Sequence, residues 1–157
     1  MSNAGEIPPP LLRRALDLKV EVAAPISLGG ANQGERRIVP IRGGEVSGRL
    51  SGRILPGGAD DQMLGADGVT RLDARYLIET SDGALIHVEN SGLRHGPPEL
   101  MERIRRGEPV DPSVIYFRCS PRFHTTAEPY LWLTRALFVG TGARGPDYVK
   151  LAIFEVV

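Results

Sequence analysis

The sequence predicts an all-β protein, a single antiparallel β-barrel of about eight strands with one short helix near residues 97–107. Nineteen glycines and 13 prolines are spread along the 157 residues and divide them into short pieces, which is typical of strands joined by turns. Most pieces alternate apolar and polar residues or are rich in β-branched and aromatic ones. The chain shows no strand–helix–strand alternation, so a barrel or sandwich is favoured over a parallel sheet.

The first expected strand, residues 15–22, alternates apolar and charged side chains, so one of its faces should be buried. Residues 36–42 form the next strand, in which Pro40 lacks a backbone donor and indicates an edge position, a bulge or a strand end. Residues 44–55 carry two glycines between strand-like residues. Such glycines are typical of a bulge or a tight bend at a barrel corner.

Residues 69–90 form the clearest unit, a hairpin around Ser81-Asp82-Gly83. A two-residue loop would mix polar and apolar residues on both faces. A three-residue loop that pairs Thr80 with Ala84 separates them, and we prefer this register because one face must be buried. Tyr76, Ile78, Ile86 and Val88 then share one face, and Arg75, Leu77, Glu79, Leu85, His87 and Glu89 share the other.

The second half of the chain holds the only good helix pattern, residues 97–108, with prolines in its first turn and Gly107 at its end. Further strands are expected at 114–119, 122–125, 130–140 and 148–157. Residues 140–145, GTGARG, match the spacing of a dinucleotide-binding loop, but Pro146 and a strand follow where that loop needs a helix. We therefore interpret them as a mobile hairpin loop.

Composition narrows the partners and the location. Nineteen basic and 19 acidic residues balance, so no nucleic-acid partner is expected. No apolar run approaches the roughly 18 residues that cross a bilayer, so no membrane partner is expected. Cys119 is the single cysteine and nothing implies secretion, which makes the cytoplasm the default location. The opening MSNA resembles an expression-tag remnant, so residues 1–15 are an extended lead-in and residues 16–157 a single domain.

Two sets of charged side chains admit two interpretations each. His87, Glu89 and His95 suggest the metal pattern of cupin barrels, but the usual His-x-His pair and a later histidine are missing. A solvated or hydrogen-bonded histidine is the better interpretation, and neither a metal nor a cofactor is expected. Asp73, Arg75 and Glu79 share a strand face that either carries weak ion pairs in water, Arg75 opposite Glu89 among them, or lines a polar lumen. We favour the lumen.

Three long phrases carry a resemblance: residues 36–62, 73–92 and 122–140. They resemble a small bacterial and fungal family known only as domain of unknown function 3237. The resemblance implies a small antiparallel barrel similar to the allene oxide cyclase-like barrels, which include cyclases and often form homo-oligomers. It also places the family's acid at Asp60, followed by Asp61 where tryptophan is common, and puts Thr134 where asparagine is frequent.

The family resemblance suggests a role for residues 53–64, RILPGGADDQML. The corner Pro56-Gly57-Gly58 holds Asp60 at the barrel mouth, and Asp61 faces solvent. We expect a barrel that binds a small, largely apolar molecule and, where it is catalytic, a cofactor-independent isomerase or cyclase with Asp60 or Glu79 as base and His124 as acid. The catalytic candidates are Asp60, Glu79 and His124, and the ligand-binding candidates are Arg37, Asp73, Arg75, Tyr76, Trp132 and Thr134.

Tyr76 fits this set least well, because the preferred hairpin register puts it on the face opposite Arg75. The alternative function is a non-catalytic carrier or a structural oligomer whose barrel is filled by packed side chains. A lumen with room for a ligand would favour binding, since typical ligand sites have about 300 Å³ or more.

Overall fold

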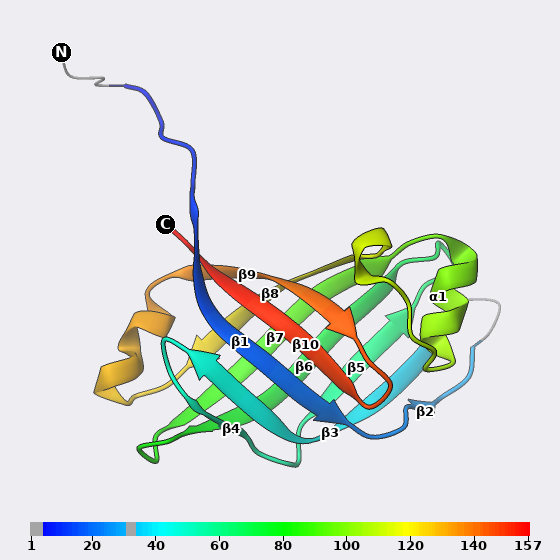
Figure 1. Ribbon diagram of the computed structural model, residues 1–157, viewed down its shortest axis with the longest axis horizontal. Coiled ribbons are helices and arrows are strands. Elements are labelled where there is room, and N and C mark those ends of the chain that lie inside the picture. The colour runs from blue at the N-terminus through cyan, green and yellow to red at the C-terminus, as the bar shows by residue number, and fades with distance from the viewer. Residues whose placement is uncertain (1–4, 31–33) are drawn as a thin grey trace.

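The computed structural model describes residues 5–30 and 34–157 and shows a closed antiparallel β-barrel (Figure 1). The strands are β1 (Leu12–Val22), β2 (Ile26–Ser27), β3 (Glu35–Gly48), β4 (Gly52–Ile54), β5 (Ala59–Leu64), β6 (Thr70–Thr80), β7 (Leu85–His95), β8 (Tyr116–His124), β9 (Leu137–Arg144) and β10 (Tyr148–Val156). They follow the order β1-β10-β9-β8-β7-β6-β4-β3-β2, and β5 pairs with other stretches of β3 and β6, in the same position between them as β4. Because β1 also pairs with β3, the sheet closes into an eight-position barrel, as predicted.

Three short helices cover the ends of the barrel. The helix α1 (Pro98–Arg105) is the one predicted, and the 3-10 turns η1 (Pro112–Val114) and η2 (Glu128–Thr134) follow it. Figure 1 places α1 and η2 at opposite ends of the molecule. Within the two described ranges, no helix has the length and apolar character needed to cross a bilayer.

The hairpin of β6 and β7 has the predicted register. The backbone N–H of Thr80 donates to the carbonyl of Ala84 over 2.8 Å, and Ile78 lies opposite Ile86. Ile78, Ile86 and Val88 are completely buried, so the apolar face of the hairpin points into the barrel. Together with Leu16, Phe138 and Ile153 from β1, β9 and β10, they fill the half of the lumen nearer η2 with hydrocarbon.

Two expectations for the second half of the chain were wrong. Residues 128–134 form the turn η2 instead of the start of a strand, because Leu133 is buried against the barrel and Pro129 begins a helical turn. Residues 140–144 are not a mobile loop but the second half of β9, paired along β10. Gly142 is required there, since a Cβ would approach the Phe117 ring to 2.8 Å.

Several strands are longer than predicted. The segments at 36–42 and 44–55 join as β3 up to Gly48, and those at 114–119 and 122–125 join as β8. Strand β1 begins at Leu12, so part of the expected lead-in pairs with β10. The MSNA segment falls outside the described residues.

Candidate functional site

The half of the lumen nearer α1 contains a group of polar side chains among apolar ones. Alternation along β5 turns Asp60 and Gln62 inward, and the same alternation on β7 and β9 brings in Asn90, Arg94 and Arg144. These five side chains, with apolar neighbours from β1, β3, β6, β8 and β10, enclose a cavity of about 50 Å³. The barrel therefore combines a filled apolar half with a small polar chamber.

Asp60 is held in place on both of its carboxyl oxygens. Its Oδ2 accepts a hydrogen bond from Gln62 Nε2 at 2.8 Å, and its Oδ1 accepts one from the backbone N–H of Asp73 at 3.1 Å. Burial raises the pKa of the Asp60 carboxyl and outweighs these hydrogen bonds and the nearby arginines, which lower it. Asp60 is therefore a fixed carboxyl that holds its proton to a higher pH than an exposed aspartate.

Two arginines, Arg94 and Arg144, face the same chamber. Arg94 is only 5% exposed and its guanidinium lies over the Phe117 ring at 5.4 Å. Burial, followed by the charge of Arg144, lowers the pKa of Arg94 to about 10, and burial likewise lowers the pKa of Arg144. Within residues 5–30 and 34–157 neither guanidinium takes part in a side-chain hydrogen bond or ion pair, and Arg94 Nε is buried without an acceptor. The chamber thus holds more positive than negative charge.

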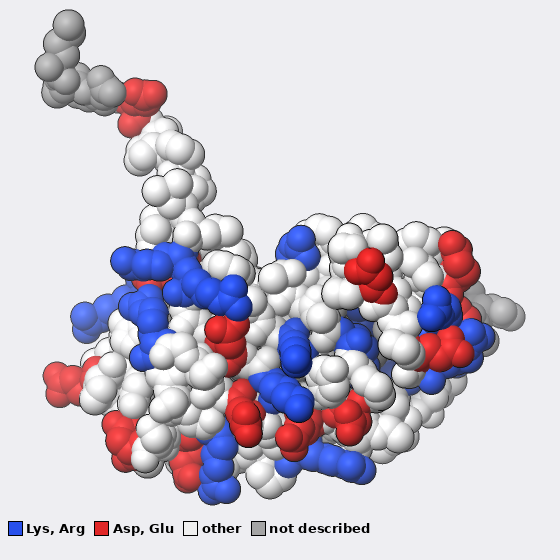
Figure 2. Space-filling view, in the orientation of Figure 1, with Lys and Arg blue, Asp and Glu red and all other residues white. Residues whose placement is uncertain are grey.

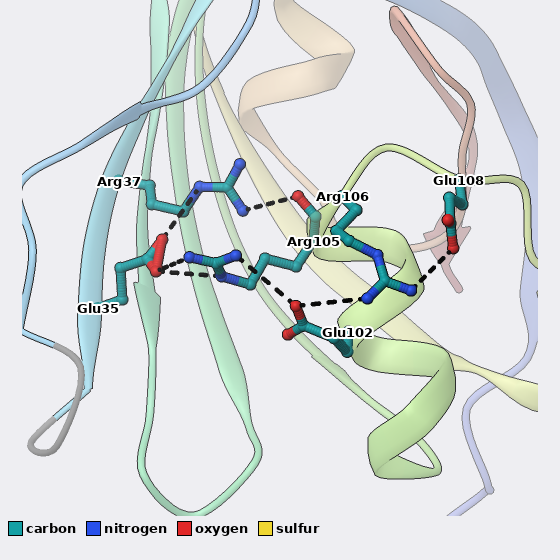
Figure 3. A network of polar contacts seen from close by, with 6 residues as sticks. All are labelled: Glu35, Arg37, Glu102, Arg105, Arg106 and Glu108. Atoms are coloured by element: carbon teal, nitrogen blue, oxygen red, sulfur yellow. Dashed lines mark hydrogen bonds and ion pairs between the residues drawn. The ribbon is translucent and has the colours of Figure 1, made fainter.

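Helix α1 sits over the mouth of this chamber and is tied to β3 by charged side chains (Figure 3). Glu35 pairs with Arg105 at 2.7 Å and with Arg37 at 3.6 Å, and Arg37 also donates to the Arg105 carbonyl at 3.4 Å. The buried Ile104 of α1 borders a void of about 10 Å³ that shares Arg94 and Arg144 with the chamber. We call residues 98–114, which cover this end, the cap.

Of the predicted site residues, three lie at this end of the barrel. Asp60 points into the lumen, whereas Asp61 points outward and pairs with Arg36 at 2.6 Å, as expected. Tyr76 is buried and lines the chamber, where burial raises the pKa of its hydroxyl. Arg37 lies at the mouth with 11% of its side chain exposed.

The expectation that the Arg75 face lines the lumen was wrong. Asp73 and Arg75 are exposed on the outside of β6, where Arg75 approaches Glu89 at 3.8 Å, and Glu79 pairs with Arg53 at 2.9 Å. The cause is closure of the sheet. Once the apolar face of the hairpin turns inward, alternation sends every residue of the charged face to solvent.

The remaining candidates lie far from Asp60 in the fold. His124 is exposed on the outer face of β8, with its ring centroid 6.1 Å from that of His87. Trp132 belongs to η2 and packs against Phe138 at 6.1 Å beneath the guanidinium of Arg49. Thr134 is exposed and donates to the Leu131 carbonyl. None of the three lines the chamber.

Sequence reasoning missed four chamber residues: Gln62, Asn90, Arg94 and Arg144. The signal was available in the period-two pattern. If the alternation of β7 is continued to residue 94, its inward-facing residues include Asn90 and Arg94. The alternation of β9 likewise turns Arg144 inward. Ending the hairpin at residue 90 and treating 140–145 as a loop concealed them.

The histidines do not assemble with other ligands. In the part of the chain that the structure describes, no three histidine, cysteine or acidic side chains form a group that could hold a metal ion. His95 instead stacks on Tyr116, with ring centroids 4.7 Å apart.

A larger depression of about 970 Å³ lies on the outer surface, bordered by outward side chains of β1, β3 and β10 such as Asp17, Lys19, Glu45 and Lys150. It is an open surface and shares only Leu151 with the chamber. Figure 2 shows acidic and basic side chains interspersed on this side of the molecule. Such mixed charge is typical of a solvated surface, so we place the candidate site in the lumen.

Comparison with known proteins identifies a matching protein family. Residues 10–156 match the family described as "Protein of unknown function (DUF3237)". A UPF0311 protein of Rhodopseudomonas palustris is 50% identical over 132 residues, 83% of this chain and 86% of its own length. One of Bradyrhizobium diazoefficiens is 47% identical over 132 residues, 84% of this chain and 87% of its own.

Solved structures show the same barrel. A conserved protein of unknown function from R. palustris superposes with a TM-score of 0.91 at 44% identity, over 97% of this chain and 100% of its own. A beta-barrel like protein from Acinetobacter baumannii superposes with a TM-score of 0.84 at 36% identity, over 98% of this chain and 99% of its own.

A more distant relative carries the name of an activity. A hydroalkoxylation enzyme of Penicillium herquei is 33% identical over 101 residues, 64% of this chain and 53% of its own length. The structure of an enzyme from the same fungus gives a TM-score of 0.73 at 23% identity, over 98% of this chain and 99% of its own, a likeness of fold alone.

Proposed function

This chain belongs to the DUF3237 family of proteins of unknown function, and from that premise we propose that its polar chamber is a small-molecule site in which Asp60 transfers a proton. The supporting observation is a carboxyl group of raised pKa, fixed by Gln62, in a chamber with two guanidiniums that form no side-chain ion pair within the described part of the chain. Perturbed carboxyls in a sheltered cavity are characteristic of acid–base sites.

The reaction that fits best is a cofactor-independent cyclisation or isomerisation. A hydroalkoxylation, the activity in the name of the P. herquei relative, adds an O–H group across a C=C bond. A C–O bond and a C–H bond form, while the O–H bond and the π bond break, so nothing is oxidised or reduced. Asp60 supplies the proton that the carbon gains, and the hydroxyl proton leaves to water or restores Asp60.

The size of the chamber limits how a substrate binds. About 50 Å³ holds a group of a few atoms, well below the roughly 300 Å³ of a typical ligand site. The reacting end of a substrate would therefore occupy the chamber, and the rest would displace the cap, which the Glu35–Arg105 pair and the packing of Ile104 hold in place.

A matched pair of variants tests the role of Asp60. We expect the protein to accelerate ring closure of a hydroxy-enone or alkenyl phenol, with 2′-hydroxychalcone and 2-allylphenol as first probes, and to give an enantiomeric excess by chiral chromatography. Asp60→Asn should lower the rate by about 100- to 10,000-fold, because the amide cannot donate the proton in the same way. Asp61→Asn, the same change one residue further on and outside the barrel, should not alter it. Equal rates for the two variants would refute the assignment.

A non-catalytic barrel is the second candidate, favoured by the hydrocarbon filling of the η2 half and by the small chamber. A carrier would bind its ligand in the Asp60→Asn variant and turn over none of the probes. A purely structural barrel would bind none of them.

A further inference from the structure

The chamber carries a surplus of positive charge inside the barrel. Arg94 and Arg144 both line it, and among the residues that the structure describes Asp60 is the one acidic side chain in its wall. No side chain in the described ranges pairs with either arginine, although Arg94 is 95% removed from solvent. A buried charge without a partner is costly, so a negatively charged group from outside the chain would complete the arrangement.

The shape of the donors indicates which negative group. A guanidinium is a planar fork that matches the two oxygens of a carboxylate. With Asp60 ionised, the two guanidiniums leave one positive charge for a ligand carboxylate, and with Asp60 protonated they leave two. The other walls are largely apolar, including Val39, Leu72 and Val149, and are suited to a carbon skeleton.

We propose that the chamber recognises organic carboxylates, with the carboxylate oxygens held between Arg94 and Arg144 and an apolar carbon skeleton directed along the lumen wall. The proposal rests on the proposed function in placing the ligand beside Asp60, and it adds the class of molecule that the site selects. A volume of about 50 Å³ is consistent with a carboxylate and the first atoms of its skeleton.

The test compares acids with their amides. Acetate, benzoate and cinnamate are titrated against the full chain and followed by thermal shift and calorimetry, beside acetamide, benzamide, cinnamamide and inorganic phosphate. At least one carboxylate should bind saturably and at least about tenfold more tightly than its amide, since a hydrogen bond to a charged group contributes more than a neutral one. Equal affinity for acid and amide throughout, or tighter binding of phosphate, overturns the proposal.

Variants locate the binding site. Arg94→Met and Arg144→Met should each weaken the carboxylate that binds by about tenfold or more. Arg122→Met is the matched control, because Arg122 is exposed on the outer face of β8, and it should leave affinity unchanged. Circular dichroism shows which variants are folded. If only one arginine variant folds, that variant decides the question. If neither folds, Arg144→Lys replaces them: it keeps the positive charge but loses the planar guanidinium, and it should bind the carboxylate several-fold more weakly. Undiminished binding in a folded variant refutes the site.

Asp60→Asn separates this proposal from the proposed function. Removal of a negative charge from the chamber should leave carboxylate affinity equal or higher while turnover is lost. Carboxylate binding at Arg94 and Arg144 with no Asp60-dependent turnover would sink the catalytic role alone. Asp60-dependent turnover of neutral substrates without preference for carboxylates would sink the carboxylate proposal alone.

Discussion

At the scale of single residues, Arg94 places a buried guanidinium in a lumen that is otherwise lined largely by apolar side chains. Arg94 belongs to the same inward row of β7 as Ile86 and Val88. A hydrocarbon side chain would therefore fit the alternation of this strand equally well. Burial lowers its pKa to about 10, which means that the folded state disfavours the charged guanidinium. A guanidinium in this position is what the proposed carboxylate site requires, whereas its burial disfavours the folded state.

Replacement of Arg94 by methionine should therefore stabilise the protein while it impairs binding. We expect the free energy of unfolding at pH 7 to rise by about 1–4 kcal/mol, as when other buried charges are exchanged for hydrocarbon. Because the pKa of Arg94 is lower in the folded state, the charged guanidinium destabilises the fold fully below pH 10 and less above it. The stabilisation of the methionine variant relative to the parent should therefore be smaller in alkaline buffer. Urea unfolding at pH 7 and pH 10.5 measures both, and a variant less stable than the parent at pH 7 would show that Arg94 supports the fold.

At the scale of elements, the cap differs from the strands around it. Its helix has one fully buried residue, Ile104, and is otherwise attached by the partly buried Leu100 and Met101 and by charged side chains at the surface. Arg105 connects it to Glu35 of β3, whereas within the described ranges Arg106 forms its ion pairs with Glu102 and Glu108, close to it in sequence. Elements with few buried contacts open more readily than the sheet on which they rest.

Loss of the Glu35–Arg105 connection should loosen the cap alone. In Arg105→Gln, we expect amide hydrogens of residues 98–108 to exchange up to about fivefold faster, which corresponds to the roughly 0–1 kcal/mol of an exposed ion pair. Strands β6 and β7 should exchange as before. Arg106→Gln is the control within the same helix and should change little, and faster exchange across the whole barrel would contradict a separate cap.

At the scale of the whole molecule, closure of the sheet decides both stability and site. Strand β1 pairs with β10 on one side and β3 on the other, so it joins the first and last parts of the chain into one barrel. Leu16 of this strand is completely buried in the filled half. Unfolding should therefore be a single cooperative event.

The substitution Leu16→Ala tests this dependence on closure. It should lower the free energy of unfolding by about 2–5 kcal/mol through lost burial and a residual cavity. Leu12→Ala, at the exposed first residue of the same strand, should lower the free energy of unfolding far less. Thermal unfolding followed by far- and near-ultraviolet circular dichroism checks both, and non-coincident transitions would argue against one cooperative unit.

The sequence by itself determined most of the strands and the hairpin register, because period-two alternation and turn residues are local signals, and the family resemblance with the Pro56-Gly57-Gly58 corner placed Asp60 at the barrel mouth. It also indicated that Tyr76 and Arg75 lie on opposite faces. Only the tertiary structure decided that the Tyr76 face is the inner one, that His124 and Trp132 do not line the chamber of Asp60, and that Arg94 and Arg144 line it. The physical reason is that alternation sorts side chains onto two faces without saying which is inside. Curvature and closure of the sheet choose the inner face and bring residues from β5, β7 and β9 to one chamber.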